Sequence, residues 1–285
     1  MLIGITTKHG LKDPHHFVKK SVAFLRKHKV HVDVCPNTCR LVPNQKPGLD
    51  FHKPYDVIVV FGGDGSLLRV VQHMRNFDSA VLSINMGRLG FFSDGVGKEY
   101  QHLLKRLIGN DYLLESRMLL RCTVLRGKRR AFTQRALNEV TIARVALARM
   151  ITLKTTVDDA AAATYVADGL VIASPTGSTG YSLSTGGPIV SPLLDSVILT
   201  PISPHSFTQK PIVLPPSSRV KVQMATSENR VYVTMDGQTG FHLHENDIVK
   251  IKRSSKRIKL VRMASTSYFQ TLREKLHWGM DLNGR

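Results

Sequence analysis

The 285-residue sequence predicts an α/β domain, then an all-β domain, then a C-terminal helix. Two observations support this prediction. Up to about residue 110, apolar strand patterns alternate with helical patterns, as in a parallel sheet covered by helices. After about residue 112, short strand patterns are separated by Gly, Pro, Ser and Asn. We therefore expect three segments, over 1–112, 113–262 and 263–285.

The first segment has a βαβ pattern. Strands are expected over 2–7, 30–35, 55–62 and 80–87. The stretch 55–62 is apolar almost throughout, as a strand buried on both faces should be. Helices are expected from Pro14, with Asp13 as its N-cap, from Ser66, and over 100–108. Ligands of such a sheet bind at the carboxyl ends of its strands.

The second segment is expected to be all β, and the tail helical. Its clearest strand patterns lie at 119–125, 151–157, 219–224, 230–235 and 247–253. In the tail, Phe269, Leu272 and Leu276 share one helical face, and Gly279 follows them. This pattern predicts a helix over 267–278 that ends at Gly279 and packs back onto one of the domains.

The composition is strongly basic. Forty Lys and Arg against 21 Asp and Glu give a formal net charge of +19, which favours polyanionic ligands. The basic clusters "RGKRR" (126–130) and "KRSSKR" (252–257) are interpreted as hairpin turns or solvated strand charge, in preference to a nucleic-acid patch. Because aromatic residues are few and no base-reading motif is found, we expect polyanionic substrates and no specific nucleic acid.

Nothing in the sequence predicts export or a membrane span. The start "MLIGITTKHG" enters a strand pattern at once, and no apolar run approaches the ~18 residues that cross a membrane. Cys35, Cys39 and Cys122 have no partners at zinc-ligand spacing. They are expected to be reduced thiols of a cytoplasmic protein.

The stretch "FGGDGSLLR" (61–69) places a carboxylate at a strand-to-helix turn. Asp64 is flanked by Gly62, Gly63 and Gly65, and the helix that follows directs its free N–H groups toward the same place. An anion built into an anion site suggests phosphate chemistry on a hydroxyl group. The alternative is that Asp64 only caps the helix.

A second informative stretch is "YVADGLVIASPTGSTGYSLSTGGPIVSP" (165–192). It is too rich in glycine and hydroxyl groups for a core strand and too apolar for a linker. An ordered loop of this kind suits a nucleotide, with Tyr181 offering an aromatic face. The alternative is a set of ordinary β-turns.

Six motifs, taken in order, resemble the NAD kinase family: "GGDGS" (62–66), "NMGRLGFF" (85–92), "LNEV" (137–140), "ADGLVIASPTGSTGYSLSTGGPIVSP" (167–192), "PISPHSFTQKPIVLP" (201–215) and "DGQ" (236–238). The resemblance implies transfer of the γ-phosphoryl group of ATP, or of a polyphosphate unit, to the 2′-hydroxyl of the adenosine ribose of NAD, giving NADP. It also implies a Rossmann-like N-terminal domain, an NAD-binding β-sandwich and a homodimer or homotetramer. A lipid or sugar kinase with a GGDG turn, or a basic polyanion-binding or nucleic-acid-binding module, are the alternatives.

The resemblance also implies roles for individual residues. Asp64 is the expected general base, and a divalent metal such as Mg²⁺ is expected with ATP, with no residue assigned to hold it. Phosphate or ATP contacts are expected from Gly62, Gly63, Gly65, Ser66 and Arg69. NAD contacts are expected from Asp64, Gly65, Phe91, Asn138, Glu139, Arg149, Asp168, Thr179, Gly180, Tyr181, Ser182, Leu183, Ser184 and Gln238.

Several positions remain open or depart from the family pattern. The alternative for Phe91 is a core position, and the alternative for Arg149 is an exposed position without a ligand. His205 is interpreted as structural. Val166 stands two residues before Asp168, where many members carry arginine. Smaller departures are Ser66 for threonine and Gly180 for alanine.

Overall fold

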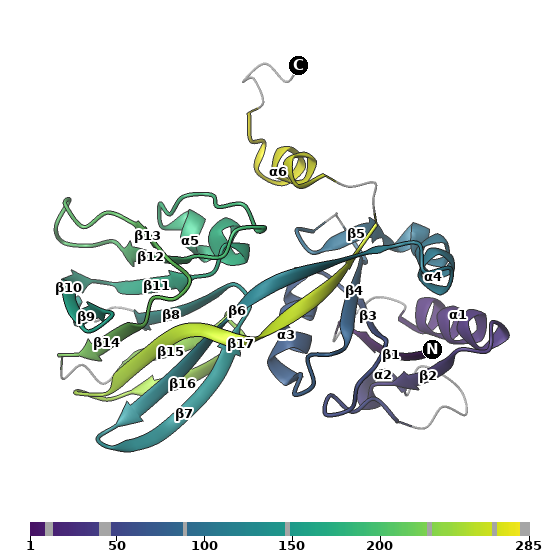
Figure 1. Cartoon of the computed structure of the whole chain (residues 1–285), viewed down its shortest axis with the longest axis horizontal. Coiled ribbons are helices and arrows are strands. Elements are labelled where there is room, and N and C mark those ends of the chain that lie inside the picture. Colours follow the sequence, from purple (N-terminus) through teal and green to yellow (C-terminus); the bar gives the residue numbers. More distant parts are fainter. Residues whose placement is uncertain are drawn as a thin grey trace. The chain divides into compact units, whose positions relative to one another are not determined.

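The computed structural model describes residues 1–8, 14–39, 47–87, 90–145, 149–226, 230–263 and 267–279. The chain forms two compact units (Figure 1). Unit 1 comprises Met1–Ser116 and Ile258–Arg285, and unit 2 comprises Arg117–Arg257. The chain passes between the units inside two long strands, β6 (Leu113–Arg126) and β17 (Ile248–Arg262). The expected N-cap Asp13 lies outside the described residues.

Unit 1 contains a parallel sheet in the order β2–β1–β3–β4. These strands are β1 (Leu2–Thr7), β2 (His31–Val34), β3 (Val57–Phe61) and β4 (Ala80–Asn85). Two further strands pair with β4 in parallel, namely β5 (Ser93–Val96) and the end of β17. All five residues of β3 are buried, as predicted for a strand covered on both faces.

The helices of unit 1 alternate with its strands along the chain (Figure 1). They are α1 (Pro14–Lys27), α2 (Pro36–Cys39), α3 (Asp64–His73), the short η1 (Gly97–Glu99), α4 (Tyr100–Ile108) and α6 (Tyr268–Leu276). Apolar residues of α1 and α4 form one core with Val57, Val59 and Phe61 of β3. The contacts of α3 are with β3 and β4. No helix in the described part of the chain is long and apolar enough to span a membrane.

Unit 2 is a β-sandwich. One antiparallel sheet has the order β13 (Ile212–Leu214), β12 (Val197–Ile202), β11 (Gly169–Ala173), β8 (Glu139–Arg144), β15 (Val231–Met235) and β16 (Thr239–Leu243). The other runs β10 (Ala160–Ala167), β9 (Ile151–Val157), β14 (Val220–Met224) and β17, which also pairs with β6, and β6 pairs with β7 (Arg129–Ala136). Alternate residues of both sheets form one apolar core, including Ile142, Leu153 and Val222. The short η2 (Thr176–Thr179) and α5 (Tyr181–Ser184) follow β11.

The predicted strands are all present, while several boundaries differ, among them that of β6, which begins at Leu113 and not at 119. Helix α3 begins at Asp64 and not at Ser66, because Gly63 is its N-cap and accepts the first amide hydrogen bonds. Helix α6 ends at Leu276, since His277 adopts the left-handed conformation (φ 53°) that ends the helix before Gly279. The strand expected over 247–253 continues to Arg262 as β17.

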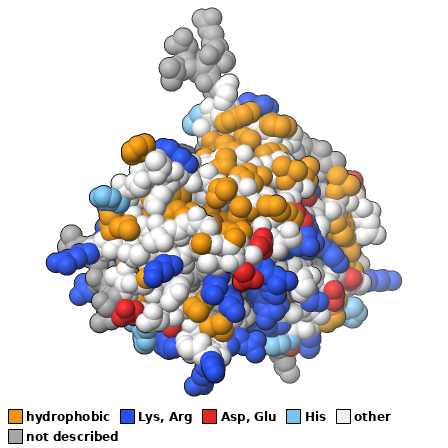
Figure 2. All heavy atoms as spheres, turned by 60° about the vertical axis from the view of Figure 1, so that its left-hand side comes forward, with side chains coloured by type: hydrophobic (Ala, Val, Ile, Leu, Met, Phe, Trp, Pro, Cys, Tyr) orange, Lys and Arg blue, Asp and Glu red, His pale blue; other side chains and the backbone are white. Residues whose placement is uncertain are grey.

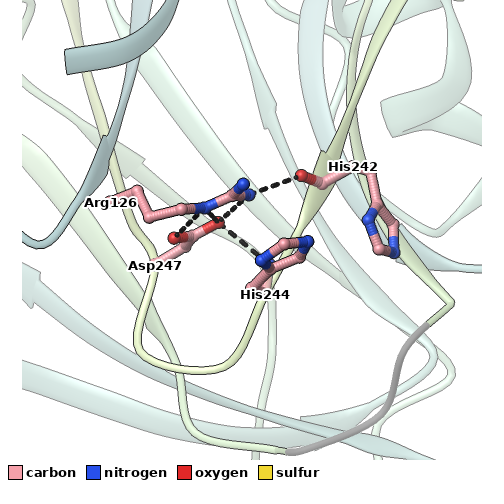
Figure 3. Close-up of polar contacts among 4 residues, drawn as sticks. All are labelled: Arg126, His242, His244 and Asp247. Carbon is pink, nitrogen blue, oxygen red and sulfur yellow. Dashed lines mark hydrogen bonds and ion pairs between the residues drawn. The ribbon is translucent and has the colours of Figure 1, made fainter. Parts of the chain in front are cut away.

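An ion pair between Arg126 and Asp247 joins the end of β6 to the turn before β17 (Figure 3). Arg126, at the end of β6, donates from Nη2 to Asp247 Oδ2 (2.8 Å) and from Nε to Oδ1 (3.0 Å). Arg126 Nη2 also donates to the carbonyl of His242 (3.1 Å), and the amide of His244 donates to Asp247 (2.9 Å). Burial alone raises the pKa of Asp247, but the hydrogen bonds from Arg126 and His244 outweigh burial and lower it. The cluster 126–130 is thus the β6–β7 hairpin turn, as interpreted.

Candidate active site

In unit 1, Asp64 is the first residue of α3 and not its N-cap, which is Gly63. Its carboxylate accepts hydrogen bonds from the backbone amides of Phe91 (2.9 Å) and Phe92 (3.3 Å). A side chain at Gly90 would overlap this carboxylate. The "NMGRLGFF" motif, through its last three residues, therefore orients Asp64 at the carboxyl end of β3.

The glycines around Asp64 matter because they have no side chain, and not because of special backbone angles. A Cβ on Gly62 would overlap the hydroxyl of Ser66, whereas a Cβ on Gly63 or Gly65 would meet nothing within 4 Å. None of these three glycines has positive φ. Gly63 and Gly65 consequently leave the backbone open at the start of α3, where helix amides favour anions. Arg69 is exposed and lies five residues beyond Asp64, about 140° around the helix.

In unit 2, Asp236 holds the backbone of the Asn-Glu pair. Its carboxylate accepts hydrogen bonds from the amides of Leu137 (2.9 Å), Asn138 (2.7 Å) and Glu139 (3.2 Å). Asp236 and Gly237 have φ of 52° and 62°, the conformation of a type I′ hairpin turn between β15 and β16. The turn thus places a buried carboxylate under the start of β8.

Asn138 and Glu139 present unused polar atoms. Glu139 is only 7% exposed, and its Oε2 and the Oδ1 of Asn138 are buried with no hydrogen-bond partner. Burial and, next, the charge of Asp236 raise the pKa of Glu139 to about 8, against the opposing hydrogen bond from the Tyr181 amide. Buried polar groups are normally hydrogen-bonded, so this corner is suited to a ligand with hydroxyl groups.

The glycine-rich loop packs directly on this corner. A Cβ on Gly177 would overlap the carbonyl of Asn138, and a Cβ on Gly180 would lie 3.1 Å from Glu139 Oε2. Ser174 donates its hydroxyl to the carbonyl of Leu137 and its amide to that of Asn138. The small residues therefore let the loop approach β8 closely, which accounts for their density.

The remaining expected site residues lie in different surroundings. Thr179 and Leu183 are half-buried, Tyr181 (44% exposed) and Ser184 are exposed, and the buried Ser182 shares a hydrogen bond with Thr200 (3.0 Å). Phe91 contacts Asp64 through its backbone, and Gln238 and Arg149 are exposed. His205, interpreted as structural, donates its amide to the carbonyl of Val166.

Two residues of this region were not predicted from the sequence. Asp236 belongs to a quoted motif, but only Gln238 was assigned from it. Arg144, at the end of β8, forms an ion pair with Asp168 (2.8 Å), and its amide donates to the Asp168 carbonyl (3.1 Å). Arg144 lies five residues after Glu139 on the same strand, but no spacing rule pairs it with Asp168. Asp168 is thus held in place by β8.

Family profiles match both parts of the chain. Residues 16–112 match the ATP-NAD kinase N-terminal domain, and residues 137–263 match the ATP-NAD kinase C-terminal domain. The chain is 42% identical over 224 residues to an NAD kinase of Geobacter metallireducens, covering 79% of each chain. It is 40% identical over 230 residues to an NAD kinase of Geotalea daltonii, covering 81% of each.

Solved structures agree with these sequence matches. A yeast NADH kinase complexed with NADH is similar with a TM-score of 0.89 and 25% identity, over 98% of this chain and 88% of that one. An NAD kinase from Archaeoglobus fulgidus in complex with ATP has a TM-score of 0.75 and 25% identity, over 97% and 99%. These matches do not favour a lipid kinase, a sugar kinase or a nucleic-acid-binding module as the main activity. The chain belongs to the NAD kinase family and is an enzyme that phosphorylates NAD with ATP.

Proposed function

We propose that Asp64 is the general base for transfer of the γ-phosphoryl group to the 2′-hydroxyl of the adenosine ribose of NAD. In this step the hydroxyl oxygen forms a bond to the γ-phosphorus, the bond from that phosphorus to the β–γ bridging oxygen breaks, and ADP leaves. The hydroxyl proton passes to the Asp64 carboxylate. The observation that supports this role is the pair of amide hydrogen bonds from Phe91 and Phe92, which fixes the carboxylate beside the open turn.

Asn138 and Glu139 are proposed to hold ribose hydroxyls of NAD. A carboxyl group and an amide side by side offer a donor and acceptors to vicinal hydroxyls, and both have a buried polar atom without a partner. Tyr181 is proposed to lie against adenine and Phe91 against nicotinamide, with Asp168 near the nicotinamide end. Thr179, Gly180, Ser182, Leu183, Ser184, Arg149 and Gln238 complete the proposed NAD contacts.

ATP is proposed to arrive with a divalent metal as one substrate. Magnesium is commonly held by one or two carboxylates together with substrate phosphates, so the ATP phosphates would supply ligands to it, and no described residue is assigned to hold it. The metal would neutralise phosphate charge. Within the described residues no group of three His, Cys, Asp or Glu side chains is placed to hold a metal by itself. Gly62, Gly63, Gly65, Ser66 and Arg69 are the proposed phosphate contacts, and polyphosphate is a possible second donor.

The test is Asp64→Asn, which keeps the size of the side chain but cannot accept the proton. We expect kcat to fall by about 10² to 10⁴, the usual range for a positioned base, with NAD affinity measured by calorimetry unchanged. Asp78→Asn, the same substitution at an exposed position of unit 1 with no assigned role, is the control and should retain kcat. A variant Asp64→Asn that keeps near wild-type kcat would exclude the base role, and loss of MgATP affinity without a fall in kcat would assign Asp64 to metal binding.

A cytoplasmic location and a homodimer or homotetramer are also proposed. The free thiols of Cys35, Cys39 and Cys122 fit a reducing compartment. Unit 2 exposes several large apolar side chains, among them Phe207 (84%) and Leu193 (79%), as expected at subunit contacts. Light scattering of the purified protein tests the assembly, and a monomer at micromolar concentration contradicts it.

A further inference from the structure

One face of unit 2 accounts for much of the positive charge that substrate binding leaves unexplained. In the sheet β10–β9–β14–β17–β6–β7, the core takes Leu153, Val222 and Ile251, so the residues next to them point outward. We call this outward side the basic sheet face. Its cations are Arg121, Arg135, Lys154, Lys221, Lys250 and Lys252.

The strands of this face hold few acids, while Asp158 and Asp159 lie in the β9–β10 turn and Asp195 pairs with Arg253 and Arg257 of β17. Strands β7, β9, β10, β14 and β17 contain no Asp or Glu, and the one acid of β6 is Glu115, which belongs to unit 1 and pairs with Arg262. On the side of the molecule in Figure 2, Lys and Arg side chains are more prominent than acidic ones, several of which lie among them, and a broad apolar patch lies above. Surfaces that serve only solubility usually intersperse both signs.

Cations on the basic sheet face also stand directly opposite each other. The antiparallel register pairs Lys221 of β14 with Lys250 of β17, and Arg121 of β6 with Arg135 of β7. Like charges at directly opposite positions destabilise a sheet. Such pairs are expected where a bound anion lies across them and removes the repulsion.

Small neutral donors lie between the cations. Across the strands, Lys154 of β9 is paired with Thr164 of β10 on one side and with Gln223 of β14 on the other. Two residues along β9, Thr156 is paired with Lys221 of β14. These five side chains line an open hollow of about 480 Å³. Measured across its six strands, the sheet is about 24 Å wide. This width is longer than a nucleotide and matches the length of about seven base pairs of duplex. The ligand is therefore an extended polyanion.

The side chains on the basic sheet face select among extended polyanions. None of its outward residues is aromatic, so unpaired bases have nothing to stack on, and large apolar side chains that enter membranes are few. Lys and Arg alternating with Thr, Ser and Gln are the residues that contact phosphates and sugars of nucleic acids. Alternation of charged and neutral donors fits a chain in which phosphates alternate with sugars better than one of phosphates alone.

We propose that the basic sheet face binds the sugar–phosphate backbone of double-stranded nucleic acid without regard to sequence. This binding is separate from NAD phosphorylation and uses none of the residues assigned to NAD or ATP. Since its basis is phosphate neutralisation, it is weakened steeply by salt.

The experiment compares two variants of the full chain that each lose four lysine charges. The face variant is K154Q/K221Q/K250Q/K252Q. The matched control, K19Q/K20Q/K27Q/K105Q, changes exposed lysines of α1 and α4 in unit 1. Binding of two unrelated fluorescent DNA duplexes is measured by anisotropy over a salt series, and thermal unfolding and NADP production are measured for each protein.

We expect the face variant to lose at least about tenfold in affinity for both duplexes, and its slope of log K against log salt to fall by about two to three. The control variant should bind like the wild type, and both should remain folded and active. Equal losses in the two variants, or no loss in the face variant, would overturn the proposal. Tighter binding of single strands, polyphosphate or phosphatidylserine vesicles than of duplex would overturn the assigned partner. Failure of NADP production in the wild type bears only on the proposed catalytic roles.

Discussion

Glu139 and Asp247 are both buried carboxylates of unit 2, with exposures of 7% and 1%, but their surroundings differ. Asp247 accepts hydrogen bonds from Arg126 and from the His244 amide, and its pKa is lowered. Glu139 lies beside the like charge of Asp236 with one oxygen unpartnered, and its pKa is raised to about 8. The first arrangement stabilises the fold, whereas the second costs stability and leaves an acceptor for the proposed ribose ligand.

The largest difference between Glu139 and Asp247 should appear in the pH dependence of the protein's stability. The pKa of Glu139 in the folded protein is raised from 4.5 to about 8. Its contribution to the stability of the fold is therefore fully present below pH 4.5 and is lost as the pH rises through about 8. The contribution of Asp247 is lost only as the pH falls through its lowered pKa. The free energy of unfolding should be measured in urea for the wild type and for Glu139→Gln. As the pH rises, the wild type should lose up to about 5 kcal/mol of stability relative to the variant, whose side chain does not ionise. A difference independent of pH over this window would show that Glu139 is not protonated in the fold.

Removing the paired carboxylate should act on stability alone. Asp247→Asn keeps the shape but leaves Arg126 without its counter-charge. We expect a loss of about 2–3 kcal/mol, below the 3–5 typical of fully buried pairs because Arg126 is 39% exposed. Denaturant unfolding measures the loss, and KM for NAD measured on the folded variant should stay at the wild-type value. A raised KM would connect this ion pair to the site.

Among the two substrates, removing the Glu139 carboxylate should weaken the binding of NAD and not that of ATP. Glu139→Ala deletes a hydrogen-bonding group worth about 1.5–3 kcal/mol to a hydroxyl ligand, so NAD affinity should fall by at least tenfold while ATP affinity is kept. Glu139→Gln, which can still donate and accept, should retain more affinity than the alanine variant. Equal losses for NAD and ATP would indicate damage to the fold and refute the ribose role.

The smallest effect is expected from the loop that covers Glu139. Gly180 has a negative φ of −94°, and a Cβ on it would lie 3.1 Å from Glu139 Oε2. Gly180→Ala should shift the carboxyl by tenths of an ångström and change KM for NAD by less than about fivefold, within about 1 kcal/mol. The control Gly109→Ala, at an exposed glycine of unit 1 whose added Cβ would come no nearer than 3.5 Å to its neighbours, separates crowding at Glu139 from loss of glycine in general.

Local patterns predicted the fold more completely than the site. Apolar runs and alternation placed the strands, and the strand–glycine–helix sequence placed the phosphate turn. The partnership of Asp236 with Asn138 joins residues 98 positions apart, and it depends on the β8–β15 register, which no local pattern reports. The pairing of Lys221 with Lys250 is hidden in the same way, so the basic residues look scattered along the sequence. Tertiary register therefore decides which polar residues meet.

The end of β17 pairs with β4 through Lys259 and Leu260, so the sheet of unit 1 takes one strand from late in the chain. Unit 2 is continuous in sequence, whereas unit 1 is interrupted by it. During synthesis from the N-terminus, every residue of unit 2 leaves the ribosome before the last strand of unit 1 is available. The sandwich is thus able to complete its core first, while the domain that carries Asp64 waits for the final tenth of the polypeptide, without which its sheet lacks the strand that pairs with β4 through Lys259 and Leu260.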